Sequence, residues 1–500
     1  MQPDRPKHQD RVQATQWFAW DPAPWDHPFL TPANLKAFRT FSEGFFARLE
    51  EQLAGQPAAL RGRRFRFAFT GNIANDLYQR LRGLSAHGLT PDLVQHPQDK
   101  FVMSDPRWEE FDGVAPESLD DLDAVNETVF THGKVHKVTG RIRHPGQISD
   151  WQKRLKKLRK TYRPEDLDRW PEFFCLLPMF KCLRGYDAVL GTQVPFVPYL
   201  ANMPYLLTQS GADIWIAASR GDAYGALHRA AYRNCAAFLV SNPWAIAHAR
   251  RLGLTNVVYL PAVIAESIYK PGPPVCRADW QQRSGGSFFV LSTSRMHEGD
   301  KGSSLGLKGF ARFARQAPGA RLVLVEWGQE KELARKVLAA EGVLDRVIFL
   351  PMSGKRRLMA YLQSAHCLLD QFVLRQLGST TREALACGLP VVVSIDVALF
   401  DAYFDGALPV LNAETDEDIA AALQRLHDEE DTRRAISASS RQWFLDNMSG
   451  ARWASRYRQI LTACALGLEF DFSDPPLQKP LSETERDYLR SGLEHAPAHP

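Results

Sequence analysis

The sequence predicts an α/β protein built from two doubly wound parallel sheets. Short apolar runs alternate with stretches of helical period between Phe288 and Val393, and a similar alternation runs from Phe65 to Leu260. Strict alternation of strands and helices along the chain predicts a parallel sheet with helices on both faces. The stretch 261–286 contains four prolines and no clear apolar period, so it is the expected linker between the two halves.

Each expected element follows from its local pattern. In the first half we expect strands at 65–69, 92–94, 186–190, 204–208, 237–241 and 257–260, and helices at about 77–84, 222–235 and 243–252. In the second half we expect strands at 288–291, 322–325, 347–350, 367–369 and 390–393, and helices at about 303–316, 329–340, 355–364 and 380–387. From about 415 to 465 the pattern is mostly helical, and the polar tail 471–500 is expected to be loosely held.

The length of 500 residues exceeds what one core supports. We expect an aromatic-rich N-terminal extension at 1–60 and a first Rossmann-like domain at 61–265. A second such domain is expected at 266–448, and a C-terminal helix with its tail, crossing back to the first domain, at 449–500. The rings at 17–25 are expected to pack on the first domain rather than to form a ligand platform.

Composition narrows the functional classes. The formal net charge of +4 is too small to argue for nucleic acid. Seven dispersed cysteines without a CxxC pair fit a reducing compartment better than a disulfide framework. The start of the chain does not read as a secretory signal, and no run is long enough to span a bilayer. We therefore expect a cytoplasmic protein.

The segment from Gly378 to Ser394 is the strongest local motif. Its pattern predicts a loop, a short helix that ends at a glycine, and a buried strand. Thr380 and Glu383 have the spacing of a capping box, and Gly388 is placed for a left-handed exit. A helix N-terminus at the open edge of a parallel sheet is an anion site, so the motif predicts phosphate binding.

A second loop adds cations to this edge. Arg295 and Lys301 follow directly on the strand 288–291, where doubly wound folds bind ligands. Two fixed cations and a helix N-terminus can stabilise charge on a phosphate without a metal ion. In the first half, Gly71 and Asn72 follow the strand 65–69, but no GxGxxG accompanies them, so a dinucleotide fingerprint is not supported.

These motifs resemble the nucleotide-sugar site of GT-B glycosyltransferases, in particular the large retaining group-1 type, also called family 4. The likeness covers roughly 186–465 and is strongest over 288–395. It implies a fold of two facing Rossmann-like domains with a cleft between them. The implied function is transfer of a sugar from a nucleotide-diphosphate donor to an acceptor held by the first domain, with retention of configuration and with no cofactor or metal.

The resemblance also assigns residues. It implies that Arg295 and Lys301 hold the donor diphosphate and that Glu383 accepts hydrogen bonds from the ribose, these three being the catalytic set. The wider donor set adds Gly328, Val347 at the base pocket, Arg375, Gly378, Ser379 and Thr380. The expected acceptor side consists of Gly71, Asn72, Ser210 and Asp213.

Two positions depart from the family pattern. The family has a glutamate eight positions before the one matching Glu383, and this chain has Arg375 there. A guanidinium cannot accept hydrogen bonds from sugar hydroxyls, so Arg375 is expected to pair with an acidic sugar, a phosphate or Glu383. The family often has histidine where this chain has Ser210. These departures leave an alternative function open, a GT-B protein without catalysis that binds a sugar nucleotide or glycan as a partner or regulator.

The partners implied are a nucleotide-sugar donor and a glycan, lipid-linked or small-molecule acceptor, with no nucleic acid. A basic amphipathic run at 151–163 has the pattern of a helix that lies on an anionic membrane. The competing interpretation is a surface helix whose apolar stripe packs on its own domain. The first interpretation extends the expected location to the inner face of the membrane.

Overall fold

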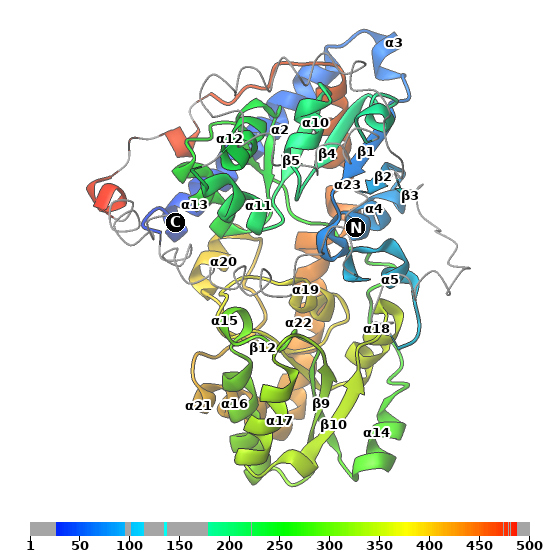
Figure 1. The fold of residues 1–500 in the computed structure, drawn as a ribbon, viewed down its shortest axis with the longest axis vertical. Coiled ribbons are helices and arrows are strands. Elements are labelled where there is room, and N and C mark those ends of the chain that lie inside the picture. Colours follow the sequence, from blue (N-terminus) through cyan, green and yellow to red (C-terminus); the bar gives the residue numbers. More distant parts are fainter. Residues whose placement is uncertain are drawn as a thin grey trace, which may run out of the picture.

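The chain folds into two parallel α/β halves, one above the other (Figure 1). The computed structural model describes residues 27–95, 102–114, 135–137, 179–221, 223–473, 475–478, 480 and 482–487. The first sheet has seven strands in the order β3-β2-β1-β4-β5-β6-β7, and the second has six in the order β10-β9-β8-β11-β12-β13. In each sheet the strand order reverses beside the first strand, as in doubly wound dinucleotide-binding folds. This confirms the predicted fold class.

The first sheet consists of short strands, of which β1, β4, β5, β6 and β7 are buried at every position. They are β1 (Phe67–Thr70), β2 (Asp92–Gln95), β3 (Val135–Lys137), β4 (Ala188–Gly191), β5 (Tyr205–Thr208), β6 (Phe238–Val240) and β7 (Val257–Tyr259). Its helices include α4 (Asp76–Ser85), α5 (Pro106–Glu110), α10 (Phe196–Leu200), α11 (Ala212–Trp215), α12 (Ala223–Asn234) and α13 (Pro243–Arg251). Apolar residues at nearly every strand position fit a sheet covered on both faces.

The second sheet follows the predicted alternation closely. Its strands are β8 (Phe288–Ser292), β9 (Ala320–Glu326), β10 (Val347–Pro351), β11 (Cys367–Leu369), β12 (Val391–Val393) and β13 (Leu411–Asn412). Between and after them lie α15 (Glu298–Lys301), α16 (Ser303–Gln316), α17 (Lys331–Ala340), α18 (Lys355–Ser364), α19 (Ser379–Ala386) and α20 (Val397–Tyr403). The two-residue β13 was not predicted, because a run that short carries no period.

The stretch expected as a linker is more ordered than predicted. Residues 261–265 are buried, and α14 (Arg277–Ser284) carries Trp280 into the core at 1% exposure. The ring of Trp280 lies 5.6 Å from that of Phe289 on β8. The stretch joins β7 to β8, as expected of a linker, but it contains a helix that the sequence pattern did not predict, because one buried tryptophan anchors a segment with little apolar period.

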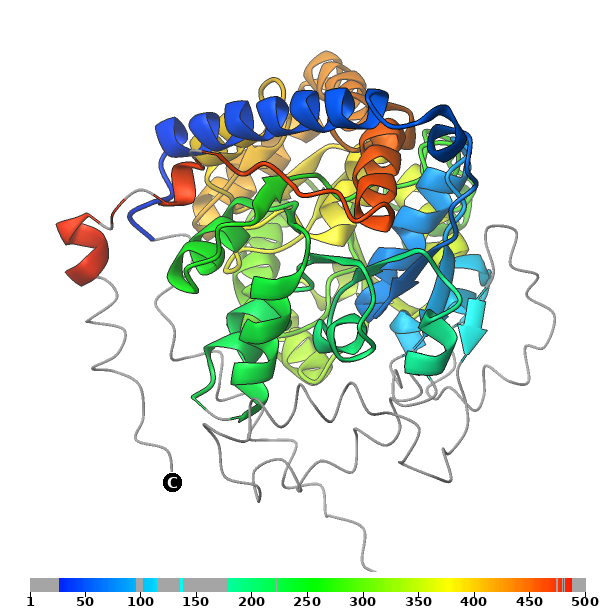
Figure 2. The same cartoon turned by 90° about the horizontal axis from the view of Figure 1, so that it is seen from above.

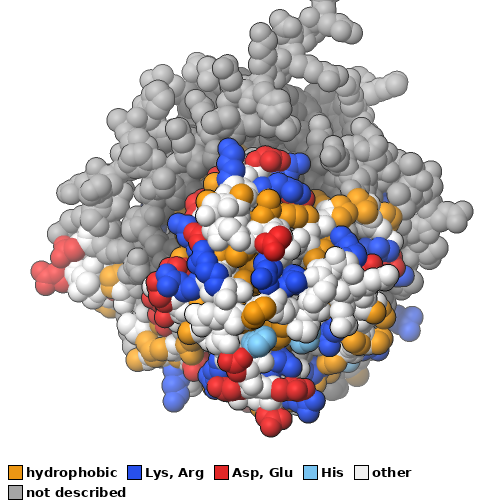
Figure 3. All heavy atoms as spheres, turned by 90° about the horizontal axis from the view of Figure 1, so that it is seen from below, with side chains coloured by type: hydrophobic (Ala, Val, Ile, Leu, Met, Phe, Trp, Pro, Cys, Tyr) orange, Lys and Arg blue, Asp and Glu red, His pale blue; other side chains and the backbone are white. Residues whose placement is uncertain are grey.

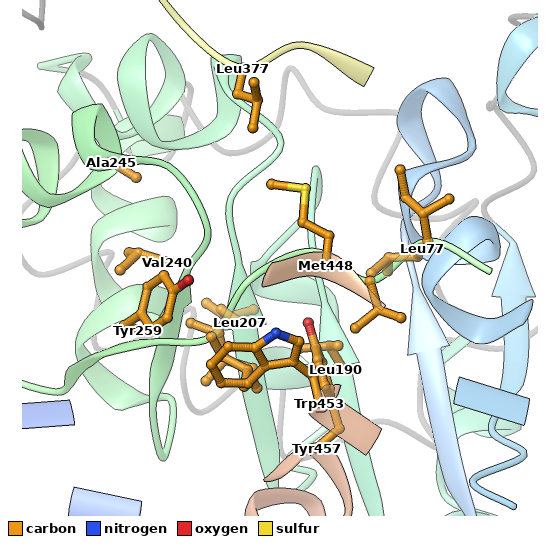
Figure 4. Packing of buried hydrophobic residues seen from close by; sticks show 14 of the residues in the cluster. Leu77, Leu190, Leu207, Val240, Ala245, Tyr259, Leu377, Met448, Trp453 and Tyr457 are labelled. Carbon is orange, nitrogen blue, oxygen red and sulfur yellow. The ribbon is translucent and has the colours of Figure 1, made fainter. Parts of the chain in front are cut away.

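The chain returns to the first half through its last long helices. These are α21 (Asp416–Asp428), α22 (Glu430–Met448) and α23 (Gly450–Ala465), as the helical pattern of 415–465 predicted. At the junction of α22 and α23, the amide of Ile264 donates to the carbonyl of Met448 at 3.1 Å. Figure 4 shows Trp453 and Tyr457 of α23 beside Leu190 and Leu207 of the first sheet.

Both ends of the described chain pack on the first half. Helix α2 (Pro32–Ala54) crosses the top of the molecule beside α23 (Figure 2). The ring of its Phe45 lies 5.1 Å from that of Phe472. Further on, Glu485 is 4% exposed and forms an ion pair with Arg250. The expectation of a loosely held tail was therefore wrong for the described residues between 471 and 487, since these contacts anchor them.

Some predictions fall outside the described residues. The tryptophans at 17–25 and the basic run at 151–163 are among them. Within the part of the chain that the structure describes, no helix combines the length and apolar character needed to cross a membrane.

Candidate functional site

The candidate donor site lies where β8 and β11 end side by side in the second sheet. Arg295 follows β8, and its guanidinium forms an ion pair with Asp300 of α15. Lys301, on the same short helix, donates from Nζ to Oε1 of Gln371 at 2.5 Å. The amide of Phe372 donates to the carbonyl of Lys301 at 2.7 Å, so the loops after β8 and β11 are tied together. The structure thus brings Arg295 and Lys301 to one edge, as predicted.

The two cations differ in their surroundings. The side chain of Arg295 is 42% exposed, whereas burial lowers the pKa of Lys301 below that of a free lysine. The charge of Arg295 lowers the pKa of Lys301 further, and Asp370 and Asp300 act in the opposite direction. Lys301 is therefore a partly desolvated cation, which an anionic ligand would stabilise.

Asp370 holds this edge together and was not predicted from the sequence. It is the first residue after β11, and its carboxylate accepts hydrogen bonds from Ser294 and Thr381. These donors lie in the loop after β8 and in the first turn of α19, so one buried carboxylate fixes both. The sequence did contain one signal for Asp370, because a polar residue directly after a buried parallel strand is often part of a ligand site.

Gly328 belongs to the same edge through its backbone. It has φ of +104°, and a Cβ there would lie 2.7 Å from the carbonyl oxygen of Met296 and 2.9 Å from Cγ of Arg295. The amide of Met296 in turn donates to the carbonyl of Trp327 at 3.0 Å. Only glycine allows the loop after β9 to approach Arg295 this closely.

The N-cap of helix α19 lies two residues before Thr380, the N-cap that the capping-box prediction requires. Gly378 is the N-cap, and no side-chain capping bond is present. The prediction that Thr380 and Glu383 form a capping box was therefore wrong. Ser379 and Thr380 instead form the first turn, beside Asp370 and its partner Thr381. Gly388, with φ of +69°, makes the predicted left-handed exit.

Glu383 is buried and already has partners. It is 2% exposed, and Nζ of Lys355 lies 2.5 and 2.7 Å from its two oxygens. Oε1 also accepts from Nε2 of Gln79 on α4 at 2.8 Å. A carboxylate has about four acceptor positions, so three hydrogen bonds leave one for a ligand. No local pattern signals Lys355 or Gln79 as a partner of Glu383, because Lys355 lies on a different helix, α18, and Gln79 belongs to the other half of the molecule.

A second carboxylate lies next to this cluster. Nε2 of Gln79 also donates to Glu109 at 3.2 Å, and the hydroxyl of Tyr269 donates to Glu109 at 2.8 Å. Burial raises the pKa of Glu109, and the negative charge of Glu383 raises it further, against the lowering effects of Lys355 and Arg82. The cluster joins α4 and α5 of the first half to α18 and α19 of the second.

Arg375 has a partner that was not anticipated. Its guanidinium forms an ion pair with Glu414, which follows β13. Their side chains are 31% and 53% exposed. Glu383 was one of the partners expected for Arg375. The structure pairs Glu383 with Lys355 instead.

Val347 lies away from the other predicted donor residues. Val347 is the first residue of β10. The last residue of that strand is Pro351, which lies opposite Glu326 at the end of β9. Four residues of parallel strand span about 13 Å, so Val347 is at the starting edge of the sheet. Its side chain packs against the apolar cluster under that edge. The structure does not bring it to Arg295.

Gly71 and Asn72 shape the facing edge of the first sheet. Gly71 has φ of +81°, and a Cβ there would lie 2.2 Å from the carbonyl oxygen of Thr192 after β4. Asn72 is fully buried, and its amide donates to Asn75 at 2.6 Å and to the carbonyl of Ser104 at 2.8 Å. Both residues therefore fix the loop that follows β1.

Asp213 has a similar positioning role after β5. Its buried carboxylate accepts from the amides of Ser210 at 3.1 Å and Gly211 at 3.0 Å. It also accepts from the amide of Gln193, in the loop after β4, at 3.1 Å. Ser210 is partly exposed beside it. Asp213 thus joins two loops at the switch point of the first sheet.

Among the described residues, no group of three or more His, Cys, Asp or Glu side chains is arranged to hold a metal ion.

Together, the two facing Rossmann-like halves and the cationic edge of the second define a protein of the GT-B class. Residues 278–443 match the family model described as Glycosyl transferases group 1. The matched range contains the whole candidate donor site from Arg295 to Glu383. The chain thus has the GT-B fold, and this part of it is similar to the glycosyl transferases group 1 family.

A curated relative is similar over part of the chain. The sequence is 25% identical over 218 residues to the GDP-mannose-dependent alpha-(1-6)-phosphatidylinositol monomannoside mannosyltransferase of Mycolicibacterium smegmatis. The alignment covers 41% of this chain and 56% of the relative, so the chain spans just over half of that protein.

Solved structures share the fold at low identity. The sucrose-phosphate synthase of Thermosynechococcus elongatus aligns over 80% of this chain and 100% of its own, with 16% identity and a TM-score of 0.51. Anabaena HepE, solved with UDP and glucose, aligns over 80% and 100%, with 11% identity and a TM-score of 0.56. WaaG, involved in lipopolysaccharide biosynthesis, aligns over 79% and 99%, with 13% identity and a TM-score of 0.50.

Proposed function

We propose that this protein is a glycosyltransferase. It would take a sugar from a nucleotide-diphosphate donor and transfer it, with retention of configuration, to an acceptor held by the first half. The observation that carries the proposal is the convergence of Arg295, Lys301 and the first turn of α19 on one edge of the second sheet. The guanidinium group of Arg295, the ammonium group of Lys301 and a helix N-terminus together can bind a diphosphate.

The proposed reaction breaks the bond between the anomeric carbon and the β-phosphate oxygen. The acceptor hydroxyl oxygen bonds to that carbon, and its proton goes to the departing phosphate. Negative charge grows on the β-phosphate as the sugar leaves. In this scheme Arg295 and Lys301 would stabilise this charge, and no metal ion is required.

Glu383 is the proposed ribose ligand. It has one acceptor position left beside Lys355 and Gln79. A ribose diol offers two donors, so the second would replace one of these protein contacts. Donor binding would then loosen the contact that Gln79 of α4 makes with Glu383 of α19.

The named relatives support nucleotide-sugar chemistry in general terms. One relative is named as GDP-mannose-dependent, and one structural neighbour was solved with UDP-glucose. They differ in the nucleotide, so this proposal includes both uridine and guanosine donors. A glycan or lipid-linked acceptor follows from the same names. A membrane contact through 151–163 and a cytoplasmic location stay predictions.

A second candidate function is binding without transfer. Arg375 stands where the family pattern has a glutamate, and it is paired with Glu414 rather than open to sugar hydroxyls. A guanidinium at the sugar end of the pocket would favour an acidic donor sugar or would leave a neutral sugar without its acceptor group.

Calorimetric titration with UDP, GDP, ADP and their glucose and mannose conjugates tests the first step. Binding of at least one nucleoside diphosphate is expected, and failure of all of them would contradict both candidate functions. Donor consumption is then followed with a panel of glycan and lipid acceptors. Transfer supports the first function, whereas binding that never leads to turnover supports the second.

A further inference from the structure

A hollow of about 720 Å³ lies at the far edge of the second sheet from Arg295. It is lined by Pro271 and Gly272, by the ends of α18 and α19, and by one face of α22. His366 and Pro390, which precede β11 and β12, form part of its wall. Because both lie before their strands, the hollow is at the starting edge of the sheet and is separate from the donor site. Its volume is in the range of small-molecule sites.

The charges around the hollow are unbalanced. Four arginines line it, Arg277, Arg433, Arg434 and Arg441, against a single carboxylate, Glu430. Glu430 pairs with Arg434 at 2.6 Å and lies 4.0 Å from Arg433. Figure 3 shows the molecule from below, on the side of the second half, with Lys and Arg side chains near the middle of the face.

Among the described residues, the hydrogen bonds of Arg277 and Arg441 all go to backbone carbonyls. Nε of Arg277 donates to the carbonyl of Ser364 at 2.9 Å, at the end of α18. Nη1 of Arg441 donates to the carbonyl of Ala386 at 2.6 Å, at the end of α19. These contacts satisfy helix ends, but a guanidinium has five N–H donors in a planar fork, so donors remain for a ligand.

Arg433 also serves a helix end, since its Nη1 donates to the carbonyl of Leu426 in the last turn of α21 at 2.7 Å, whereas Arg434 forms an ion pair with Glu430. They follow the first turn of α22, which begins at Glu430. The N-terminus of a helix carries partial positive charge, so the dipole of α22 adds to the field of these arginines. Helix capping therefore uses one donor of Arg433 and leaves its other donors, and the position of Arg434, unexplained.

The positive charge around the hollow affects the pKa of the neighbouring His366. Burial and the charges of Arg277 and Arg433 lower the pKa of His366 to about 3. Burial also lowers the pKa of Arg277, and Arg433 lowers it further. His366 is therefore neutral at pH 7, and the wall beside it keeps uncompensated guanidinium charge that an anion would balance.

We propose that this hollow is a second binding site, for a small molecule that carries phosphate groups. Guanidinium groups bind phosphate oxygens through paired, charge-assisted hydrogen bonds. Arg433 and Arg434 would supply the main contacts, with Arg277 and Arg441 at the sides. The site is independent of the proposed transfer reaction, since none of its residues lies at the donor edge.

Inorganic pyrophosphate is the probe, titrated by calorimetry at low salt into the full chain. The wild type is expected to bind two equivalents, one at the donor edge and one in the hollow. Arg295→Gln should remove the first. Arg433→Gln and Arg434→Gln should each weaken the second at least about tenfold, the effect of losing one charge-assisted hydrogen bond.

The matched control is Arg312→Gln, which removes the same charge from an exposed pair with Asp416 and Glu417 in the same half. It should leave both binding events unchanged. Arg434 is 73% exposed on its side chain, so its replacement should not affect folding, and a thermal melt checks this. A single equivalent that disappears in Arg295→Gln would overturn the proposal. So would equal weakening in Arg434→Gln and Arg312→Gln, because long-range charge alone would then explain the binding.

Discussion

Replacing Lys355 by methionine tests the ion pair at the centre of the candidate site. The side chains of Lys355 and Glu383 are 14% and 3% exposed, so the pair is largely removed from water. Lys355→Met would leave the carboxylate of Glu383 buried, with only the amide of Gln79 as a partner. Removing one member of a buried pair costs about 3–5 kcal/mol, and the remaining hydrogen bond places this case near about 3 kcal/mol.

Differential scanning calorimetry measures this loss. For domains of this size, about 3 kcal/mol corresponds to a fall in Tm of about 6–12 °C for the transition of the second half. Lys308→Met is the control, because Lys308 is an exposed lysine on α16 of the same half, and its Tm should stay near that of the wild type.

The double variant Lys355→Met with Glu383→Gln separates the charge from the packing. An uncharged amide no longer needs a cation, so the double variant should recover most of the lost stability. A fall in Tm of less than about 2 °C for Lys355→Met would refute the reasoning, since it corresponds to under about 1 kcal/mol. Failure of the double variant to recover would also refute it, because the loss would then come from packing.

Three further predictions concern the donor edge and the C-terminal segment. The affinity of the wild type for a nucleoside diphosphate should fall at alkaline pH, because burial lowers the pKa of Lys301, and Lys301→Arg should remove that fall in calorimetric titrations. Gly328→Ala should destabilise the protein by roughly 2 kcal/mol, because its φ is positive and its Cβ would crowd Met296, and nucleotide binding should weaken with it. Burial alone would raise the pKa of Glu485, but hydrogen bonds from Arg250 and Ser482 lower it to about 2. The stability from this pair, about 3 kcal/mol, is therefore present above pH 4.5 and lost as the pH falls through about 2. In Glu485→Gln, urea unfolding at pH 7 should show that loss already, and wild-type stability there would contradict the prediction.

The second sheet could be predicted because its pattern is local. Runs such as Val391–Val393 are apolar on both faces, and the helices between them have a clear period, so the ends of the five predicted strands agree with the structure within two residues. Arg295 and Lys301 could be placed at the same edge because both follow one strand, and parallel strands end together. These inferences need no knowledge of distant contacts.

The partners of the site residues could not be predicted. Glu383 contacts Gln79 across about three hundred positions of sequence, and no local pattern reports such a pair. Arg375 and Glu414 come together only because β13 lies beside β12. The capping-box pattern at Thr380 was also misleading, since the Glu383 side chain turns to Lys355 rather than back to its own helix end.

The central claim is that the edge containing Arg295 and Lys301 holds the diphosphate of a nucleotide. Calorimetry of Arg295→Ala with UDP or GDP, compared with uridine or guanosine, tests it most directly. The side chain of Arg295 is 42% exposed, so the variant should fold. The account predicts that the variant loses at least about tenfold in affinity for the diphosphate while its weak affinity for the nucleoside is unchanged. An equal loss for both ligands, or no loss for either, would contradict it.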